Sequence, residues 1–497
     1  MSLSLIGKEN AFVHSASGQL SRRRSSHAVV TGGSLAGMLA ARVLSDHFER
    51  VTVIERDKLP DEPTPRKGVP QARHLHVMMA RGQLIVEQFF PGLRDEMIAA
   101  GAPVLDMAED AAWLTPAGWG LRYSSGLKLL TFTRGMLDWK VRQRLAAFPN
   151  VRFIEEAETT RLLPNADDSG VGGVGIRFRN RTNGSTVPEQ LHYADLVVDA
   201  SGRGSRAPQW LEGLGYDTPA ETVINSFRGY ASRFYQPPAN VSADWKGIFI
   251  QAAPPERTRG GLLFPVEGNR WMVTLIGGGR EYPPADEAGF RDFARSLASP
   301  MIHDALDGAV PLTPIHTYRA TENRLRHFDR LSRWPENFVV LGDATCAFNP
   351  VYGQGMTIAA LGALTLDGAL RELRELRRGD TRSLAGMSRR FQKRLAKVNR
   401  APWLLATGED FRYHETVGGS PTLTTRLMHR YMEQVMRLSI ENRHVRQRFL
   451  EIFNMLRPPS ALFHPRVVWE VVKLSLRLTP IPKTPTSMPQ TTAGATT

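Results

Sequence analysis

A glycine-rich turn near the start of the chain has the residue types of a nucleotide-binding site. The segment VVTGGSLAGMLAARVL, residues 29–44, has the pattern of a buried strand, a tight turn and a helix. Gly32 would permit the turn, and Gly37 would let the helix pack closely on the strand. Backbone N–H groups at the start of such a helix bind a pyrophosphate, and Ser34, which stands where a second glycine is usual, is small enough to leave room for it. The turn predicts a dinucleotide site.

An acidic residue follows this turn at the spacing that ribose binding requires. Glu55 ends the strand pattern RVTVIERD, residues 50–57, about 20 residues beyond Gly32, where an acid binds the ribose hydroxyls of the adenosine. Arg56 comes next and is a further candidate for this end of the cofactor. Because a carboxylate would repel a 2′-phosphate, Glu55 argues against NADP in this pocket.

A second constellation, LGDATCAFNPVYGQGMT at residues 341–357, favours a flavin. Asp343 ends a buried strand pattern, where an aspartate is either a turn or cap residue or the acceptor for a ribityl hydroxyl. The glycines that follow precede a helix, so backbone N–H groups and the helix dipole would lie near an electron-rich ring. The cofactor-binding candidates of this segment are Asp343, Pro350, Gly353, Gln354, Gly355 and Met356.

These motifs together resemble the FAD-dependent monooxygenases of the para-hydroxybenzoate hydroxylase fold. The resemblance rests on the first turn with Glu55, on DASGRGSR at residues 199–206 and on GDATCAFNPVYGQGMT, which follow one another in the family's order. It implies that Gly32, Ser34, Gly37 and Glu55 hold the ADP part of FAD, that Asp343 contacts the ribityl chain, and that Gly353 to Met356 lie beside the isoalloxazine.

The chain departs from the family at two positions. Ser201 stands where the second motif usually has aspartate, next to the retained Gly202, and Thr357 stands where an asparagine is usual. The second motif is associated with both FAD and NAD(P)H in the family, so Asp199 and Gly202 are candidates for the cofactor, whereas direct use of NAD(P)H is left open.

A proline-rich loop, PRKGVPQARHLH at residues 65–76, narrows the resemblance to actinomycete flavin epoxidases that act on polyene precursors of polyether antibiotics. The family folds a basic residue and a Gly-Val pair over the flavin here. This makes Arg66 a candidate for the cofactor and places Gly68 and Val69 beside the ring. Arg134 is either a flavin contact or a solvated helix start. The remaining polar loop residues are expected to be satisfied by backbone partners: Gln71, Arg73, His74 and His76.

The resemblance implies an FAD-dependent monooxygenase that receives electrons from NAD(P)H, directly or through a partner flavin reductase. A flavin C4a-hydroperoxide formed with O₂ would epoxidise an alkene or hydroxylate a lipophilic or aromatic substrate, in secondary metabolism. Because the cofactor supplies the difficult chemistry, no catalytic residue is assigned. Two alternatives share the fold: a flavin reductase of prenyl chains, and a flavin halogenase, whose Trp-x-Trp-x-Ile-Pro signature is absent from the sequence.

The elements that must position these residues indicate an α/β protein with a Rossmann-like, three-layer FAD-binding domain. Strand patterns at residues 27–31 and 50–57, with a helix between them, predict parallel strands joined by a right-handed crossover. Alternating segments between about 222 and 280 predict an inserted antiparallel substrate sheet. Its aromatic residues, Phe227, Tyr230, Phe234, Tyr235, Phe249 and Phe264, form either a substrate wall or ordinary core.

The expected organisation of the chain has five parts. These are a disordered basic tail (1–26), an FAD-binding domain in two pieces (27–220 and 315–400), a β-rich substrate domain (221–314), a C-terminal helical region (401–478) and a disordered tail (479–497). A helix over residues 133–148 is expected to bury Leu137, Val141 and Leu145 on one face.

Composition excludes several other kinds of protein. The net charge is +14, but the basic residues are spread along the chain without interleaved aromatics, so nucleic acid is not expected as a partner. The single cysteine, Cys346, permits no disulfide within the chain and no cysteine metal cluster, and is expected to be a small buried residue. No apolar run is long enough for a membrane span or a signal peptide, which predicts a cytoplasmic protein. No metal is expected, because His74 and His76 are only two residues apart and form no metal-binding pair at helical spacing. The segment 462–478 has a mixed apolar and basic face and either packs on the core or touches a membrane surface.

Overall fold

The computed structural model describes residues 26–179, 188–239, 243–376 and 383–476. The two predicted tails, 1–26 and 479–497, lie outside these ranges except for Ser26. The first motif belongs to a five-stranded parallel sheet in the order β20-β11-β1-β2-β7. Its strands are β1 (His27–Thr31), β2 (Arg50–Ile54), β7 (Val151–Ile154), β11 (Leu196–Asp199) and β20 (Phe338–Val340).

Both faces of this sheet are covered, which gives three layers. One face packs on α1 (Leu35–Ser45), α4 (Arg134–Ala146) and α8 (Gly355–Leu376); the other packs on the antiparallel sheet of β8 (Ala157–Pro164), β9 (Val171–Phe178) and β10 (Gln190–Tyr193), together with α5 (Ala207–Gly213). Ala28 and Val30 of β1 face the helices, whereas Val29 faces the small sheet. Because both faces are buried, the strand is a continuous apolar run.

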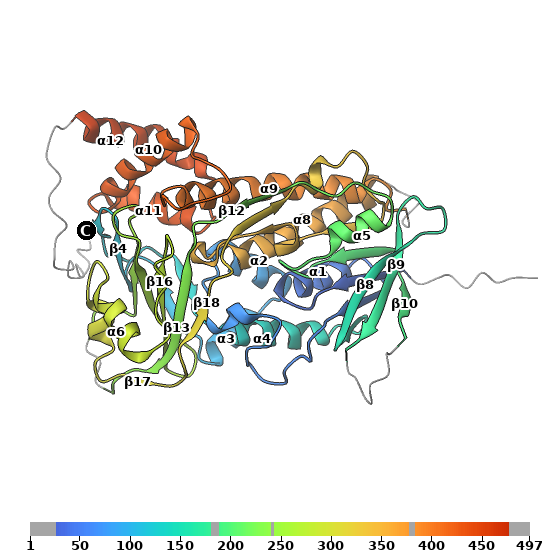
Figure 1. Ribbon diagram of the computed structural model, residues 1–497, viewed down its shortest axis with the longest axis horizontal. Coiled ribbons are helices and arrows are strands. Elements are labelled where there is room, and N and C mark those ends of the chain that lie inside the picture. Colours follow the sequence, from blue (N-terminus) through green and yellow to red (C-terminus); the bar gives the residue numbers. More distant parts are fainter. Residues whose placement is uncertain (1–25, 180–187, 240–242, 377–382, 477–497) are drawn as a thin grey trace, which may run out of the picture.

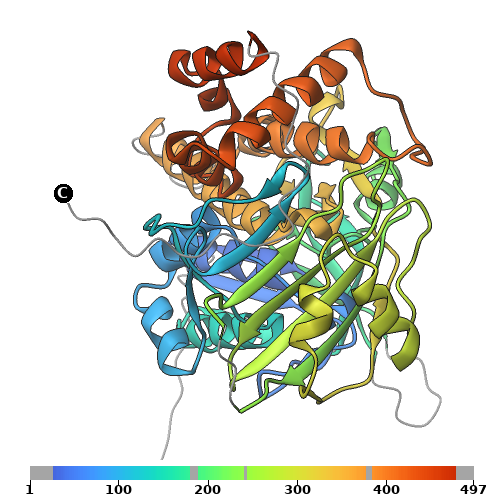
Figure 2. The same ribbon diagram turned by 90° about the vertical axis from the view of Figure 1, so that its left-hand side faces the viewer.

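A larger sheet of eight strands forms the second body of the fold, at the left in Figure 1 and at the front in Figure 2. Its strands are β4 (Ala111–Thr115), β5 (Gly118–Trp119), β13 (Gly229–Gln236), β14 (Gly247–Ile250), β15 (Gly260–Val266), β16 (Arg270–Gly277), β17 (Val310–Pro311) and β18 (His316–Tyr318). α6 (Glu287–Arg295) and α7 (Met301–Ala305) cover its outer face. Its inner face is turned toward the loop between β2 and α2 (Ala80–Phe89), since Ser232 and Thr274 of the sheet bond residues of that loop.

Smaller elements connect these two bodies. β12 (Glu221–Ile224), β19 (Asn323–Arg326) and β21 (Cys346–Ala347) form one short sheet, and β3 (Val104–Asp106) pairs with β6 (Lys128–Leu130). Two short 3-10 turns matter below: η1 (Pro70–Arg73) in the loop before α2, and η4 (Pro350–Tyr352) before α8. α3 (Leu93–Ala99) follows α2.

The last part of the described chain is helical. α9 (Met387–Asp410) lies along α8, and α10 (Leu423–Ser439), α11 (Arg443–Phe453), η5 (Pro459–Phe463) and α12 (Pro465–Leu476) follow at the top left of Figure 1. Within the described ranges, every helix is too short or too polar to cross a membrane.

Most of the predicted elements are found, with three differences. The strand at 27–31 is confirmed, as is the burial of Leu137, Val141 and Leu145 on α4. The large sheet is not wholly antiparallel, because β4 pairs with β14 in parallel. β4 and β5 also come from the stretch assigned to the FAD-binding part, and α9 runs through the expected boundary at 400. A pairing between strands more than 100 residues apart leaves no local sequence signal.

Candidate functional site

The carboxyl ends of β1 and β2 place the first glycine turn beside Glu55. Gly32 has a φ of +98°, and a Cβ at this residue would lie 2.5 Å from the carbonyl oxygen of Ala200. The Gly33 N–H donates to Glu55 Oε2 at 2.8 Å. Ser34 is the N-cap residue of α1, so the first N–H groups of that helix face the same edge of the sheet. The turn and the acid therefore meet as the sequence predicts.

Helix α1 packs so tightly on this turn that Gly37 has no room for a side chain. A Cβ there would collide with the carbonyl oxygen of Gly32. Gly37 thus sets the position of the helix N-terminus rather than lining an open space.

Two arginines from other segments reach the turn. Arg66 pairs with Glu55, with 2.7 Å between Nη1 and Oε2. Arg134, the first residue of α4, donates to Ser34 Oγ at 2.8 Å and to Asp138 Oδ1 at 2.7 Å. Arg134 is buried, so the alternative of a solvated helix start is wrong. The pairing of Arg66 with Glu55 has no counterpart in the sequence pattern.

The loop that carries Arg66 lies against the first turn rather than the second. Gly68 donates its N–H to Asp57 Oδ2 at 2.7 Å and accepts from Arg56 Nη2 at 3.3 Å. A cavity of about 20 Å³ between loop and turn is lined by Gly33, Arg66 and Val69, among others.

The second glycine turn has a different neighbour in this loop. A Cβ on Gly353 would lie 3.5 Å from the carbonyl oxygen of Val77. The placement of Gly68 and Val69 beside a flavin ring stays a prediction, and the loop residue nearest to Gly353 is Val77. The 3-10 turn η1 lies between Val69 and the segment that reaches Gly353.

The motif after β11 forms a buried turn. Asp199 is fully buried, accepting from the Ser201 N–H at 2.9 Å and from Ser205 Oγ at 2.5 Å, and burial raises the pKa of its carboxyl. Gly202 has a φ of +83°. The carboxylate of Asp199 is thus engaged within its own turn, which leaves it little capacity for a ligand.

Asp343 has the opposite surroundings. It follows β20 in the turn η3 (Gly342–Ala344) and is partly buried, yet no described residue donates a hydrogen bond to its carboxylate. Burial raises the pKa of this carboxyl, while Arg203 and Arg134 favour its charged form. A partly buried carboxylate without a donor is an available acceptor for a hydroxyl-rich ligand.

The segment between η4 and α8 is also free to accept a ligand. Gln354 is buried, and its Oε1 has no hydrogen-bond partner. A Cβ added to Gly355 would meet nothing within 4 Å, so there is open space at the N-terminus of the 22-residue helix α8. Met356 is buried and Pro350 is exposed. The open space, the unpaired amide oxygen and the helix N-terminus suit a flat, electron-rich ring.

Buried polar groups from β13 and α9 form a network of hydrogen bonds with η4 and its N-cap residue. The Val351 N–H donates to Tyr230 Oη at 2.8 Å, and Tyr230 Oη donates to Asn349 Oδ1. Tyr352 Oη donates to Asp410 Oδ1, the last residue of α9, at 2.5 Å. The C-terminal helical part therefore takes part in positioning this turn.

Arg228 supplies the positive charge of this network. Its guanidinium lies 5.2 Å from the ring centre of Tyr352 and 4.6 Å from that of Tyr413, and its Nε is 3.6 Å from Asp410 Oδ1. The nearby phenol oxygens and Asp410 raise the pKa of Arg228 despite its burial. No sequence pattern indicates this cluster, because its members are far apart along the chain.

His74 joins the loop to the inner face of the large sheet. His74 Nδ1 lies 2.8 Å from Ser232 Oγ, which lies 2.6 Å from Thr274 Oγ1; the Leu75 N–H donates to that same Thr274 oxygen. Burial lowers the pKa of His74 to about 4, so the imidazole is neutral. His76 bonds the carbonyl of His74, as expected, whereas the expectation of a backbone partner is wrong for His74 itself.

The aromatic residues predicted as a substrate wall divide between the two faces of the sheet. Tyr235 packs in the outer core against α6 and α7, so it cannot line the inner face. Phe249 and Phe264 lie on the inner face with Leu75 and Leu262. Phe249 and Leu262 are only half-buried, which leaves apolar surface between the sheet and the loop. Phe227 and Phe234 are covered by Arg280 and Arg270.

The structure does not support a cysteine nucleophile or a metal site in the described part of the chain. Cys346 is fully buried, and burial raises the pKa of its thiol, so it is not a reactive thiolate. In the part of the chain that the structure describes, no group of three His, Cys, Asp or Glu residues is placed to hold a metal ion.

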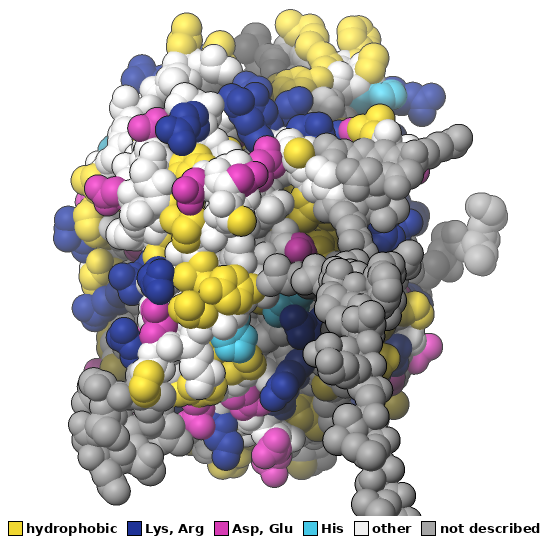
Figure 3. Space-filling view, turned by 90° about the vertical axis from the view of Figure 1, so that its right-hand side faces the viewer, with side chains coloured by type: hydrophobic (Ala, Val, Ile, Leu, Met, Phe, Trp, Pro, Cys, Tyr) yellow, Lys and Arg dark blue, Asp and Glu magenta, His cyan; other side chains and the backbone are white. Residues whose placement is uncertain are grey.

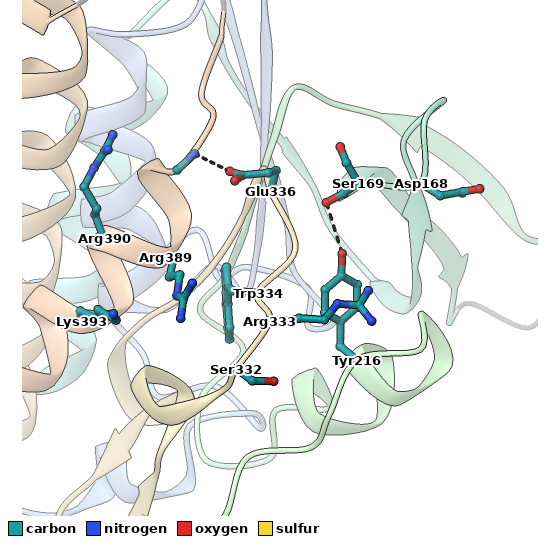
Figure 4. Close-up of a pocket in the computed structure, with 11 residues that line it drawn as sticks. Asp168, Ser169, Tyr216, Ser332, Arg333, Trp334, Glu336, Arg389, Arg390 and Lys393 are labelled. Carbon is teal, nitrogen blue, oxygen red and sulfur yellow. Dashed lines mark hydrogen bonds between the residues drawn. The ribbon is translucent and has the colours of Figure 1, made fainter.

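A separate cavity of about 590 Å³ lies near the amino end of β20 and the start of α9 (Figure 4). Its walls include Trp334, Tyr216 and the basic residues Arg333 and Arg389. Tyr216 Oη donates to the Ser169 carbonyl at 3.2 Å. None of the sequence-predicted site residues lines it, and the candidate site is at the carboxyl ends of the strands.

The amino-acid sequence matches one family model and several known proteins. The FAD binding domain family model matches residues 25–375. The chain is 35% identical over 396 residues to Protein Rv3254 of Mycobacterium tuberculosis, covering 78% of this chain and 81% of that protein. It is 27% identical over 369 residues to kynurenine 3-monooxygenase of Salinispora arenicola, covering 70% and 73%, and 22% identical over 353 residues to squalene epoxidase 1 of Arabidopsis thaliana, covering 71% and 60%.

Solved structures share the fold at low sequence identity. The flavin-dependent brominase Bmp2 superimposes with a TM-score of 0.61 at 11% identity, covering 90% of this chain and 100% of that one. PqsL of Pseudomonas aeruginosa superimposes with a TM-score of 0.56 at 18% identity, covering 78% and 98%. These likenesses concern the α/β architecture with its parallel and antiparallel sheets and C-terminal helices.

Proposed function

Since this chain belongs to the FAD binding domain family and is an FAD-dependent oxidoreductase of the monooxygenase type, we propose that it uses O₂ to epoxidise an alkene of a lipophilic substrate. Squalene epoxidase 1 among its relatives supports epoxidation, and kynurenine 3-monooxygenase supports ring hydroxylation as the second candidate. A role in secondary metabolism belongs to the same proposal and rests on the resemblance of the loop 65–76 to polyether epoxidases.

The residues at the strand ends fit FAD. We assign the pyrophosphate to the start of α1 with Ser34 and Arg134, because free helix N–H groups and a guanidinium meet there. Glu55 would accept from the ribose hydroxyls, and Arg56 borders the same end. Arg66 now pairs with Glu55 and would be free to pair with a phosphate when ribose takes its place.

The other end of the cofactor is assigned to the second turn. Asp343 would accept from a ribityl hydroxyl, since its carboxylate has no donor among the described residues. Gly353, Gln354, Gly355 and Met356 would border the ring, where the unpaired Gln354 Oε1 could accept from a ring N–H. Gly37, Asp199 and Gly202 are assigned positioning roles in their turns. FAD, when bound and reduced, supplies the reaction with O₂.

One observation carries the choice of substrate class. Phe249 and Leu262 remain half-buried on the inner face of the large sheet, next to Leu75 of the loop. The neighbouring loop residue His74 contacts the ring of Tyr230, which bonds the turn before the proposed flavin segment. This half-buried apolar surface therefore adjoins the proposed ring site, where an apolar chain would be held away from water.

The test is oxygen transfer by the purified, FAD-reconstituted protein. We expect bound flavin, consumption of O₂ with NADH or NADPH, directly or with an added flavin reductase, and incorporation of one labelled oxygen atom into a polyene as an epoxide. A panel of phenols and aromatic amines under the same conditions tests the second candidate.

Three results would overturn the proposal. A product that forms without O₂ would indicate a reductase of prenyl chains. A product that requires bromide or chloride would indicate a halogenase. Failure to bind FAD after reconstitution would contradict the cofactor placement itself.

A further inference from the structure

Helices α10 and α12 are amphipathic, and they bury their apolar sides against each other. Val435 and Leu438 of α10 share a hydrophobic core with Val467 and Val471 of α12, to which α11 and Leu462 contribute. The hydroxyl of Tyr431 donates to the Leu462 carbonyl, which fixes η5 on α10. The two helices are therefore a packed unit, and their remaining faces are turned outward.

Those outward faces also carry large apolar side chains. Leu423 and Leu427 lie on α10, Trp469, Val472 and Leu476 lie on α12, and Phe463 ends η5 between them. We call these six side chains the apolar crest, and each is between 40% and 75% exposed. The spacing of four residues on α10 and of three and four on α12 keeps each set on one side of its helix. Figure 3 faces the opposite side of the molecule from these helices, where hydrophobic side chains lie among basic and acidic ones. A gathering of exposed apolar side chains such as the crest marks an interaction surface.

Arginines accompany the crest without acidic partners. Arg426 and Arg430 lie on the exposed face of α10, and Arg466 on that of α12. In the described part of the chain none of these three forms an ion pair. The nearby acids are already engaged, since Glu433 pairs with Arg412 and Glu470 with Lys473. The surface is thus apolar and positively charged at the same time.

Helix α9 carries further positive charge. Four basic residues recur along its exposed side at spacings of three and four: Arg389, Lys393, Lys397 and Arg400. They lead toward Leu404, which is also exposed. At physiological salt such charges act over about 8 Å, far enough to attract an anionic surface before the crest makes contact.

We propose that the apolar crest docks this protein on an anionic lipid bilayer. Helices that lie in a membrane interface have leucine and tryptophan on one side and arginine and lysine beside them, which is the pattern found here. The positive charge of the arginines beside the crest argues against a second copy of the chain as the partner that covers it. A two-fold symmetric contact would bring the same unpaired arginines of both copies together, whereas lipid phosphates neutralise them.

The test is co-sedimentation of the full chain, loaded with FAD, with vesicles. We expect binding to phosphatidylcholine vesicles that contain phosphatidylglycerol, much weaker binding to pure phosphatidylcholine, and loss of binding as salt is raised. Arg426→Gln, Arg430→Gln and Arg466→Gln should together weaken binding about a hundredfold, at about fivefold for each charge. Because Trp469 belongs to the crest, the tryptophan emission of the parent chain should shift to shorter wavelength with anionic vesicles, and that of Trp469→Phe should shift less.

Two matched double variants test whether vesicle binding depends on the crest itself or on any pair of exposed apolar residues. Leu423→Ser with Leu427→Ser should abolish vesicle binding, whereas Val310→Ser with Leu312→Ser, exposed on the large sheet, should leave it unchanged. Both variants should keep their flavin content and melting temperature.

Equal binding by the two variants, or by charged and neutral vesicles, overturns the proposal. A dimer in light scattering that Leu423→Ser with Leu427→Ser dissociates, without any vesicle binding by the parent chain, assigns the crest to a second copy instead.

Discussion

The two carboxylates that follow neighbouring strands meet opposite surroundings in the folded chain. Glu55 accepts from the Gly33 and Asp57 N–H groups and pairs with Arg66, whereas no described residue donates to Asp343. The sequence indicates both positions, because a strand pattern ends at each. It cannot indicate which carboxylate is already satisfied, since Arg66 comes from a loop whose path depends on the whole fold.

Replacing the unsatisfied carboxylate should separate stability from cofactor binding. Burial raises the pKa of Asp343, so the folded chain binds that proton more tightly than the unfolded chain, and stability is lost as pH rises through the raised value. Asp343→Asn should therefore stabilise the cofactor-free chain at neutral pH. It should weaken FAD binding about tenfold to a hundredfold through loss of a charged acceptor. Melting curves and flavin titrations at several pH values measure both effects.

The control for this variant is Asp168→Asn, at an exposed turn away from the strand ends. It should change neither quantity. If Asp343→Asn were less stable than the parent chain and bound FAD equally well, Asp343 would be a structural cap.

His74 should make the protein sensitive to acid. Burial lowers its pKa from 6.5 to about 4, so the stability provided by the neutral imidazole is present above 6.5 and is lost as pH falls toward 4. His74→Gln has no such proton to bind and should lose less stability over that range, by up to about 3 kcal/mol. Urea unfolding at pH 7 and near pH 4 measures the difference. The same pH dependence in both proteins would contradict the burial of a neutral imidazole.

At the scale of elements, the two glycine turns use their glycines for different purposes. Gly37 allows α1 to touch the backbone of Gly32, whereas Gly355 borders open space at the start of α8. The sequence pattern is the same in both places, a glycine at the first turn of a helix. Only the packing distinguishes a glycine required by the fold from one that leaves room for a ligand.

This difference predicts opposite behaviour for two glycine substitutions. Gly355→Val should leave the melting temperature of the cofactor-free chain nearly unchanged, because a Cβ at this residue meets nothing within 4 Å, yet weaken FAD binding at least tenfold by filling the ring site. Gly37→Ala should lower the free energy of unfolding by about 1–3 kcal/mol through overpacking. Calorimetry and flavin fluorescence distinguish the two. Normal FAD affinity in Gly355→Val would place the ring elsewhere.

For the molecule as a whole, the sequence predicts local elements better than the contacts between them. Strand β1, helix α4 and both glycine turns follow from short patterns, and the resemblance supplies their arrangement. The parallel pairing of β4 with β14, the pairing of Arg66 with Glu55 and the cluster of Arg228, Tyr352 and Asp410 were not predicted. Each depends on segments that only the complete fold brings together.

The C-terminal helical part is joined to the FAD-binding part through Asn454, at the end of α11. This residue is fully buried; its Oδ1 accepts from the Ala80 N–H at 3.1 Å, and its carbonyl accepts from the Arg81 N–H at 3.2 Å. It therefore caps α2, whose own N-cap residue Met79 cannot do so with its side chain. Since Met79 in turn donates to Thr357 of α8, the two parts share one chain of contacts near the proposed flavin segment.

This connection predicts that both parts unfold together. Asn454→Ala should remove the cap and leave a buried N–H unpaired, at a cost of about 1–3 kcal/mol. The temperatures of flavin release and of helix loss by circular dichroism should then fall by the same amount, because α2 and α8 lose support with α11. Asn442→Ala, which removes the cap of α11 itself, should shift both signals in the same way. If either variant melted the helical signal in part while flavin release stayed at the parent temperature, the C-terminal helices would be a separate cooperative unit, and the bonds between Asn454 and α2 would not couple them to the cofactor site.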